Sequence, residues 1–405
     1  MGYREEGKWW VSPSNYDKEV TEQFNFHPNI KILDTTLRDG EQQAGVILTK
    51  EEKISIAKKL DEAGVHRIEA GTPAVSKEDE EAIREIANLG LNAEVYCFIR
   101  NMKVDVDLAL SCGVHGVVAE IPGSEHLLKL GAGKSVEWAI EKAIETTAYA
   151  HEKGLDVIFF PADGSRASID FLMDTVEAIV KGGGHMDSLA LVDTFGALSP
   201  EGAVRRVKQL MERFPDTPIE AHFHEDFGIG TATTLAALAA GCSAAHVSVN
   251  GIGERAGSVP LEPLVMSLEA LYGVNTGIKT EKLKELSKLV EELTVDPVPH
   301  TAPIVGDNIW RWETGMPSML WMNVKDTDPL VMLPYQWNQI GGEMPKLEIG
   351  KKSGKANLNF WFEKTGLTVT EEKQGDLLQA IKELSISLKR TLTEAEFREL
   401  VAAHQ

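Results

Sequence analysis

The regular alternation of short apolar runs with amphipathic stretches constrains the fold of this chain more than any other sequence feature. Between about residues 30 and 275, each of eight apolar runs precedes a stretch with helical periodicity. Two of these stretches, 49–64 and 199–214, begin at the capping residues Thr49 and Ser199. The eight runs, which we predict to be strands, are residues 30–35, 66–71, 93–99, 116–121, 156–161, 188–193, 218–223 and 244–249.

Eight strand–helix units in about 250 residues are the pattern of a (β/α)8 TIM barrel. A doubly wound open sheet produces the same alternation, and alternation alone does not distinguish the two folds. The number of strands favours the closed barrel. The predicted fold class is therefore α/β, a TIM barrel with small α(+β) subdomains appended at its C-terminal side.

The expected organisation is an N-terminal arm over residues 1–29, a barrel over 30–279 and appended subdomains over 280–405. The β/α alternation stops after about residue 275, and the pattern then predicts a charged helix over 280–293. A loop-rich stretch to about residue 358 and two helical patterns complete the chain.

The charge and the cysteine content exclude several classes of protein. The chain carries 62 Asp and Glu against 41 Lys and Arg, a net charge of −21, which argues against a nucleic-acid or membrane partner. Its three cysteines, Cys97, Cys112 and Cys242, form no CxxC pair, which fits a reducing cytoplasm. No apolar run is long enough to span a membrane, and the N-terminus lacks the apolar segment of a signal peptide.

Polar side chains recur where the predicted strands end, and in a barrel these ends converge on the catalytic face. Any one of these residues could be a structural hydrogen-bonding group, but their recurrence at one face predicts a site. We expect catalytic roles for Arg38, Glu69 and Asp163 and substrate contacts for Gln42, Arg100, Glu120 and Thr194.

His222 and His224 are the sharpest feature of this set. Residues i and i+2 of a strand point to the same side, so both imidazoles can reach one ion. Asp39, after the first strand, completes a two-histidine, one-carboxylate set that leaves positions open for a chelating oxo acid. The alternative is a pair of packed or solvent-facing histidines beside an acidic loop. An Arg-Asp-Gly sequence after the first strand favours the metal site.

Arg38 and Thr194 each have two interpretations. The guanidinium of Arg38 can stabilise an enolate oxygen, or it can pair with Glu69 or Glu120 at other strand ends, and the two roles are compatible. Thr194 can bind a substrate carboxylate or make a local hydrogen bond to the backbone, and the residue alone favours the second.

Three stretches at these strand ends carry a family resemblance. ILDTTLRDGEQ (32–42), AHFHEDFGIG (221–230) and VNGIGERAG (249–257) resemble the DRE-TIM metallolyase superfamily. Within it, the chain is similar to the isopropylmalate, homocitrate and citramalate synthases, and residues 302–316 and 347–358 resemble the subdomains that follow the barrel in that group.

The resemblance implies a divalent metal (Mg, Mn or Zn) on Asp39, His222 and His224. It also implies Arg38 as the electrostatic catalyst and Thr194 as a contact of the oxo-acid carboxylate. The implied reaction is the Claisen condensation of an acyl-CoA, foremost acetyl-CoA, with a 2-oxo acid. The aromatic arm and the appended subdomains predict a homodimer in which one chain's tail covers the other's barrel.

Four positions depart from the synthase pattern. Ala162 stands where the group has Glu, Pro317 where it has a proton-transferring His, Met332 where it has Tyr, and Ser258 where it has Asn. Neither proline nor methionine can accept a proton, so the acyl donor needs another base. Other candidates for this base are Tyr335, Glu313 and His300.

These departures keep two alternatives to the synthase open. One is a lyase or aldolase that cleaves a related hydroxy acid or hydroxyacyl-CoA, which needs a base on a hydroxyl group rather than an enolising pair. The other is a non-catalytic barrel that keeps its metal for structure. A purely structural metal would leave Arg38, which lies beside it, without a chemical role.

Overall fold

The computed structural model describes residues 2–405, which form two compact units. The first unit is Ser14–Val298, and the second combines the residues up to Pro13 with Pro299–Gln405. Each unit is described by itself below.

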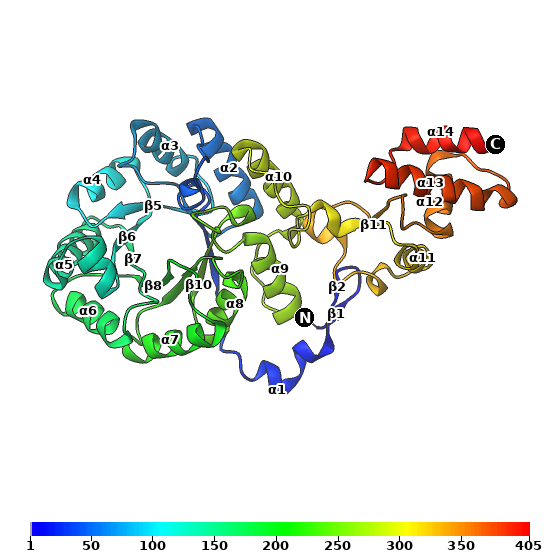
Figure 1. Ribbon diagram of the computed structural model, residues 1–405. Helices are drawn as coiled ribbons and strands as arrows, with labels where there is room; N and C mark the ends of the chain where they lie inside the picture. Colours follow the sequence, from blue (N-terminus) through cyan, green and yellow to red (C-terminus); the bar gives the residue numbers. More distant parts are fainter. Residues whose placement is uncertain (1) are drawn as a thin grey trace. The chain divides into compact units, whose positions relative to one another are not determined.

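The first unit is a closed barrel of eight parallel strands, as predicted (Figure 1). Closure is made by the last strand, which pairs with the first strand on one side and with the seventh on the other. All eight predicted strands are present, and no end differs from its predicted position by more than two residues. They are β3 (Lys31–Asp34), β4 (Arg67–Glu69), β5 (Glu94–Arg100), β6 (Gly116–Pro122), β7 (Asp156–Ala162), β8 (Ser188–Asp193), β9 (Ile219–Phe223) and β10 (Ala244–Val247).

An outer ring of helices covers the strands (Figure 1). The first helix of the ring begins at a capping box between Thr49 and Glu52 and ends at Gly64, whose φ of 88° is favourable only for glycine. The helices are α2 (Lys50–Ala63), α3 (Lys77–Ala87), α4 (Lys103–Cys112), α5 (Val136–Glu152), α6 (Ile169–Lys181), α7 (Pro200–Arg213), α8 (Gly230–Ala240) and α9 (Leu261–Tyr272).

Side chains fill the barrel interior, so the barrel is a packed core and not a channel. Leu33, Tyr96, Val118, Ile158 and Phe160, from four different strands, belong to one buried cluster. Because this cluster closes the middle of the barrel, polar groups near the carboxyl ends of the strands lie above an apolar floor.

The boundary between the units differs from the predicted one at residue 279. Helix α10 (Leu283–Thr294) packs on α2 and therefore belongs to the barrel unit, which ends inside the Pro-rich stretch at Val298. The predicted arm, residues 1–29, is divided between the units. Its residues up to Pro13 belong to the second unit, whereas Phe24 and Phe26 contact Tyr272 of α9 in the barrel unit.

The second unit has its own core, built mainly from three helices where the sequence predicted two. Its buried apolar residues include Ile349, Trp361, Leu377, Phe397 and Val401. The N-terminal residues join it through a β-bridge between Trp9 and Tyr335. Its elements are β1 (Arg4–Glu5), β2 (Trp9–Trp10), β11 (Arg311–Trp312), α11 (Gly315–Val324), β12 (Lys346–Leu347), α12 (Lys355–Thr365), α13 (Gln374–Leu388) and α14 (Glu394–His404).

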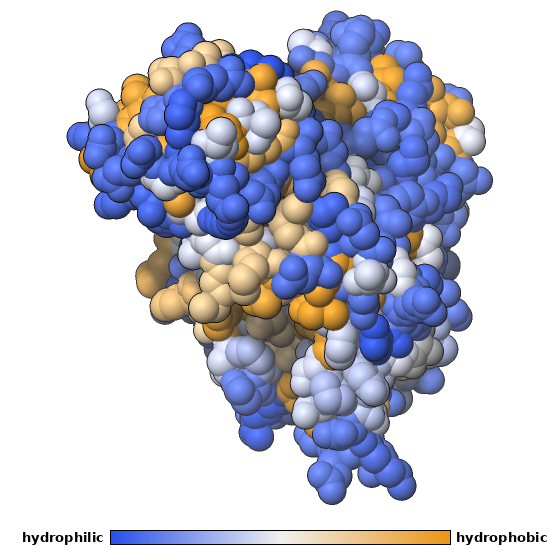
Figure 2. All heavy atoms as spheres, turned by 90° about the vertical axis from the view of Figure 1, so that its right-hand side faces the viewer, coloured by the Kyte–Doolittle hydropathy of each residue, from blue (hydrophilic) through white to orange (hydrophobic). Residues whose placement is uncertain are grey.

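Apolar side chains gather on part of the surface shown in Figure 2. The exposed apolar residues of the second unit include Met316, Met319 and Leu320 on α11 and Val331 shortly after it. Within residues 2–405, no helix is both long and apolar enough to cross a membrane.

Asp34 and Glu262 are buried acidic side chains of the barrel unit that accept hydrogen bonds from backbone amides. Asp34 accepts a hydrogen bond from the Thr36 amide through Oδ1, while its buried Oδ2 has no partner. Glu262 accepts the Asn250 amide. Burial raises the pKa of each carboxyl to about 7, partly opposed by these hydrogen bonds.

We predict that Asp34→Asn makes the fold less sensitive to pH. A folded-state pKa above the unfolded value means that the folded state keeps its proton longer, so stability is greatest in acid and falls as pH rises from about 4 to about 7. Thermal unfolding at about pH 5 and about pH 8 should show a smaller drop in Tm for Asp34→Asn than for the wild type. Asp326→Asn, at an exposed position, is the control. An unchanged pH dependence in Asp34→Asn would contradict the prediction.

Candidate metal and substrate site

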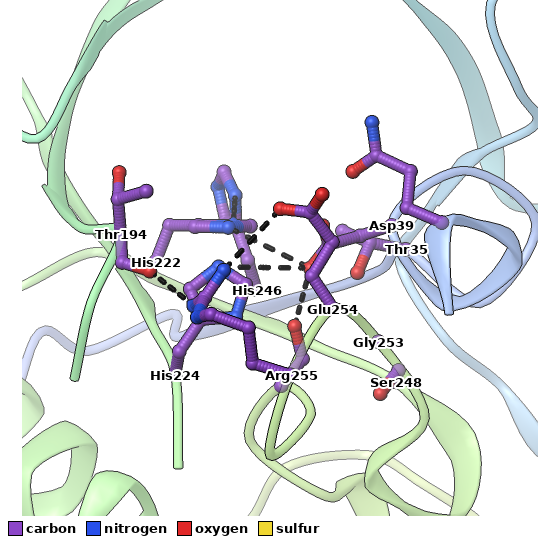
Figure 3. A network of polar contacts seen from close by, with 12 residues as sticks. Thr35, Asp39, Thr194, His222, His224, His246, Ser248, Gly253, Glu254 and Arg255 are labelled. Carbon is purple, nitrogen blue, oxygen red and sulfur yellow. Dashed lines mark hydrogen bonds and ion pairs between the residues drawn. The ribbon is translucent and has the colours of Figure 1, made fainter. Parts of the chain in front are cut away.

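Asp39, His222 and His224 meet above the barrel core, as the sequence predicted (Figure 3). The Nε2 atoms of His222 and His224 lie 3.7 and 4.0 Å from Oδ2 of Asp39, and all three side chains are buried. His222 belongs to β9 and His224 follows it, so the two-residue spacing places both imidazoles on the same side of the strand. They line one wall of a cavity of about 170 Å³.

The protonation states of this set suit a divalent cation. Burial lowers the pKa of His222 well below its usual value, and the neighbouring His224, His246 and Arg38 lower it further, so the imidazole is neutral. Burial would raise the pKa of Asp39, but Arg38, His224 and the Ser258 hydroxyl outweigh it and lower the pKa. A neutral imidazole and an ionised carboxylate are what metal ligation requires, so His222 and Asp39 fit a divalent ion.

A buried relay orients His222 from below. Its Nδ1 lies 3.2 Å from Nδ1 of His246, whose Nε2 lies 2.8 Å from Oε2 of Glu220. Arg67 donates to Glu220 at 2.8 Å. With His222 donating its Nδ1–H to His246, and His246 donating to Glu220, Nε2 of His222 keeps its lone pair facing Asp39.

Ser258 supports the carboxylate member of the set. Its hydroxyl donates to Oδ2 of Asp39, and a β-bridge joins Ser258 to His224. The position that carries Asn in the resembling synthases therefore touches the metal site here through a hydroxyl group.

Arg38 lies beside Asp39, and one nitrogen of its guanidinium has no hydrogen-bond partner. Its Nε donates to Glu69 at 2.9 Å, and its Nη1 donates to Asp39 at 3.1 Å and to Gln42 at 3.3 Å. The guanidinium lies over the Phe98 ring at 4.5 Å. Its Nη2 is buried without a hydrogen-bond partner, which costs free energy unless a ligand supplies an acceptor. Arg38 therefore has both predicted features, the ion pair with Glu69 and a donor available for an anionic oxygen.

Glu69 and Glu120 lie close enough to Arg38 to feel its charge, and Thr194 lines the same cavity as Arg38 and Glu120. Burial raises the pKa of Glu69 and of Glu120, and the charge of Arg38 opposes this in both cases. Oγ1 of Thr194 accepts the Asp163 amide at 2.8 Å, which leaves the hydroxyl proton available to the cavity that Thr194 lines. The backbone hydrogen bond expected of Thr194 thus coexists with a free donor.

The structure does not bring Arg100 or Asp163 to this cavity. Arg100 is more than half exposed and makes a two-point ion pair with Asp105, five residues further along the chain. Asp163 is fully buried and is held by Arg166, Ser124 and a contact to His126. Both side chains satisfy their charge locally, so their positions give no support to the predicted substrate and catalytic roles.

Several residues of the site were not identified from the sequence. His246 lies inside a strand predicted correctly, but a single histidine in an apolar run carries no sign of its relay partner Glu220. Phe98, Phe160 and Ala162 form the apolar part of the cavity wall. The residues that line the cavity are Arg38, Asp39, Gln42, Phe98, Glu120, Phe160, Ala162, Thr194, His222, His224 and Glu254.

The fold is a TIM barrel whose strand ends bring two histidines and an aspartate together beside an arginine. A sequence model of the HMGL-like family matches residues 29–290, and the chain belongs to this family. The resemblance to the DRE-TIM synthases expected from the sequence is thereby confirmed.

Named relatives cover most of the chain. It is 38% identical to the putative (R)-citramalate synthase CimA of Archaeoglobus fulgidus, over 92% of this chain and 74% of that protein. It is 38% identical to the homocitrate synthase AksA of Methanothermobacter thermautotrophicus, over 93% of both chains. It is 40% identical to a probable 2-isopropylmalate synthase of Methanopyrus kandleri, over 88% of this chain and 70% of that one.

Solved structures support the fold. An HMG-CoA lyase of Bacillus subtilis superposes with a TM-score of 0.60 at 24% identity, over 68% of this chain and 96% of the lyase. At this identity the likeness shows the barrel fold alone.

We predict that His246→Gln weakens metal binding without removing a ligand. Loss of the partner that orients a ligating histidine typically lowers metal affinity by about 10- to 100-fold. Titration of metal-free protein with Mn²⁺, followed by electron paramagnetic resonance, measures the affinity directly. His115→Gln, at a half-exposed histidine, is the matched control. Equal Mn²⁺ affinity in His246→Gln and the wild type would show that the relay does not position His222.

Proposed function

We propose that this chain is a divalent-metal-dependent acyltransferase. It condenses an acyl-CoA, acetyl-CoA in the first place, with a 2-oxo acid to give a 2-alkylmalate or homocitrate-type product. The observation that carries the proposal is the free Nη2 of Arg38 beside the buried side chains of Asp39, His222 and His224 in one cavity. The relatives named as synthases support the same reaction class.

Each polar group of the cavity has a place in this reaction. A divalent ion (Mg, Mn or Zn) held by Asp39, His222 and His224 would supply Lewis-acid polarisation of the oxo-acid carbonyl. Arg38, fixed by Glu69, donates through Nη2 to the oxygen on which negative charge develops. This donor is already desolvated and oriented, so little reorganisation accompanies the charge shift.

Thr194 and Gln42 bind the oxo acid in this proposal. The free hydroxyl proton of Thr194 donates to the substrate carboxylate, because its oxygen already accepts the Asp163 amide. Gln42 holds Nη1 of Arg38 and lines the cavity beside it. Through Thr194, Asp163 orders the wall to which the substrate binds.

Glu120 is the barrel residue that we propose as proton acceptor for the acyl donor. It lines the cavity, and burial raises its pKa, which makes its carboxylate a stronger base. At the positions that carry His and Tyr in the resembling synthases, this chain has Pro317 and Met332, and Ala162 adds no carboxylate to the wall. Among the described residues, Asp39, Glu120 and Glu254 are the carboxyls that line this cavity, and burial raises the pKa of Glu120.

The lining of the cavity favours a neutral substrate side chain. Phe98, Phe160 and Ala162 form its apolar wall, and Arg38 is the one guanidinium or ammonium group among the lining residues. A second substrate carboxylate would be buried without a cation of its own, which costs several kcal/mol. We therefore propose that 2-oxo acids with small uncharged side chains are preferred over 2-oxoglutarate.

A lyase or aldolase remains the second candidate. Pro317 and Met332 provide no proton acceptor, and carbon–carbon cleavage of a hydroxy acid needs a base only on a hydroxyl group. The two candidates differ in whether a thiol is released from an acyl-CoA.

Thiol release from acetyl-CoA, measured with pyruvate, 2-oxoisovalerate and 2-oxoglutarate in the presence of Mn²⁺ or Mg²⁺, tests the proposal. We expect turnover that EDTA abolishes, with kcat/KM for the best neutral acid on the order of 100-fold above that for 2-oxoglutarate. Arg38→Gln should lower kcat by about 100- to 1000-fold, because it removes a preorganised donor. Absence of thiol release with every acid, together with cleavage of hydroxy acids, would favour the lyase.

We also propose a cytoplasmic homodimer. Cys97, Cys112 and Cys242 are all buried and unpaired, which suits a reducing compartment. The exposed apolar side chains of α11, including Met316 and Leu320, offer a surface for a second copy. Light scattering should give twice the chain mass, and a monomer would contradict the dimer.

A further inference from the structure

A second group of metal-ligating side chains lies at the opposite end of the barrel. His151 is in the last turn of α5, and His185 and Asp187 are in the connection from α6 to β8. The strands are parallel and the central cavity lies at their carboxyl ends, so the connection that enters β8 lies at the amino ends. These three residues therefore share no part of the central site.

The three side chains already face one another. The rings of His151 and His185 are stacked with centroids 3.5 Å apart and planes inclined by 19°. Nε2 of His185 lies 3.1 Å from Oδ1 of Asp187. One ligand atom from each residue lies within 4.8 Å of the other two.

Local hydrogen bonds hold two of these residues in place. Oδ2 of Asp187 accepts the Val157 amide at 2.8 Å, which leaves Oδ1 directed at His185. The amide of His185 donates to Oγ1 of Thr147 at 3.1 Å, and Thr147 is one helical turn before His151 on α5. The cluster is thus tied to both elements that contribute to it.

The electrostatic setting favours a cation. Helices α5 and α6 both end beside this cluster, α5 at Glu152 and α6 at Lys181. The carbonyl ends of helices carry partial negative charge, which stabilises positive charge nearby. The carboxylate of Asp187 adds a full negative charge.

We propose that His151, His185 and Asp187 bind a divalent transition-metal ion, Zn²⁺ in the first place, at a surface site separate from the catalytic cavity. Two imidazoles and one carboxylate suit Zn²⁺ rather than Mg²⁺ or Ca²⁺. Tetrahedral ligands about 2.0–2.1 Å from zinc lie roughly 3.3 Å apart, close to the present His185–Asp187 distance. His151 is exposed, so its ring is free to tilt out of the stack and complete the set.

The bound ion fixes the end of α5 to the connection before β8 and leaves a fourth position for water. Because the ion binds the folded state, Zn²⁺ raises the Tm of the wild type and has a smaller effect when one ligand is missing. Turnover is not needed for either effect, so this inference stands or falls separately from the proposed function.

Zinc titration of the full-length, tag-free, metal-free protein tests the site. The background is the His222→Ala, His224→Ala double variant, in which the central ligands are gone and circular dichroism verifies the fold. Competition with a chromogenic chelator should show one Zn²⁺ bound per chain. Adding His185→Ala to the double variant should lower the Zn²⁺ affinity by about 100-fold or more. His300→Ala, which removes an exposed histidine from the other unit, should leave the stoichiometry unchanged. The proposal would be overturned if the double variant bound no zinc, or if its zinc affinity were the same with and without His185→Ala.

Zinc-soaked crystals of the wild type give a second readout that needs no variant. Anomalous diffraction should show a peak between His151, His185 and Asp187 in addition to any peak in the central cavity. A map with density only in the central cavity would overturn the proposal, even if the double variant failed to fold.

Discussion

The pairing of β10 with β3 is the interaction on which the site depends. In the closed ring, β10 lies between β3 and β9, in register with Lys31–Asp34 on one side and with Glu220–Ala221 on the other. Asp39 follows β3, and His222 and His224 lie at the end of β9, so the three side chains meet only because the ring closes. In an open sheet, the first and seventh strands would not share a neighbour, and the carboxylate and the imidazoles would lie apart.

Closure of the barrel buries several charged side chains, and each buried charge is costly unless it is paired or hydrogen-bonded. Arg38 is held between Glu69 and Asp39, and Arg67 supports Glu220 below the relay histidine. One buried atom that remains without a partner is of chemical interest. Nη2 of Arg38 is a donor without an acceptor, at the place where a reaction that generates an oxyanion needs one. In the proposed reaction this donor stabilises the transition state, at some cost in folding stability.

The periodic features of this protein could be read from the sequence. Strands buried on both faces give continuous apolar runs, so all eight were found, and the two-residue spacing of His222 and His224 fixed their common direction. Capping residues such as Thr49 and Ser199 predicted where helices begin, because an N-cap hydrogen bond joins residues close together in the sequence.

Features set by long-range or loop geometry could not be read in this way. Arg100 ends a strand, but its side chain pairs with Asp105, five residues later in the sequence. Asp163 has a φ of 63°, and its side chain is turned into the barrel wall. The boundary at Val298 depends on the packing of α10 against α2, which are far apart in the sequence. The relay through His246 and the hydroxyl of Ser258 likewise join residues that only the folded ring brings together.

The central claim is that Asp39, His222 and His224 hold one divalent cation. Anomalous diffraction from crystals grown with Mn²⁺ tests it most directly. The account predicts a single strong peak within about 2.3 Å of Oδ2 of Asp39 and of Nε2 of both histidines, and its loss in Asp39→Ala. A map without manganese between these three side chains, or a peak that persists unchanged in Asp39→Ala, would contradict the account.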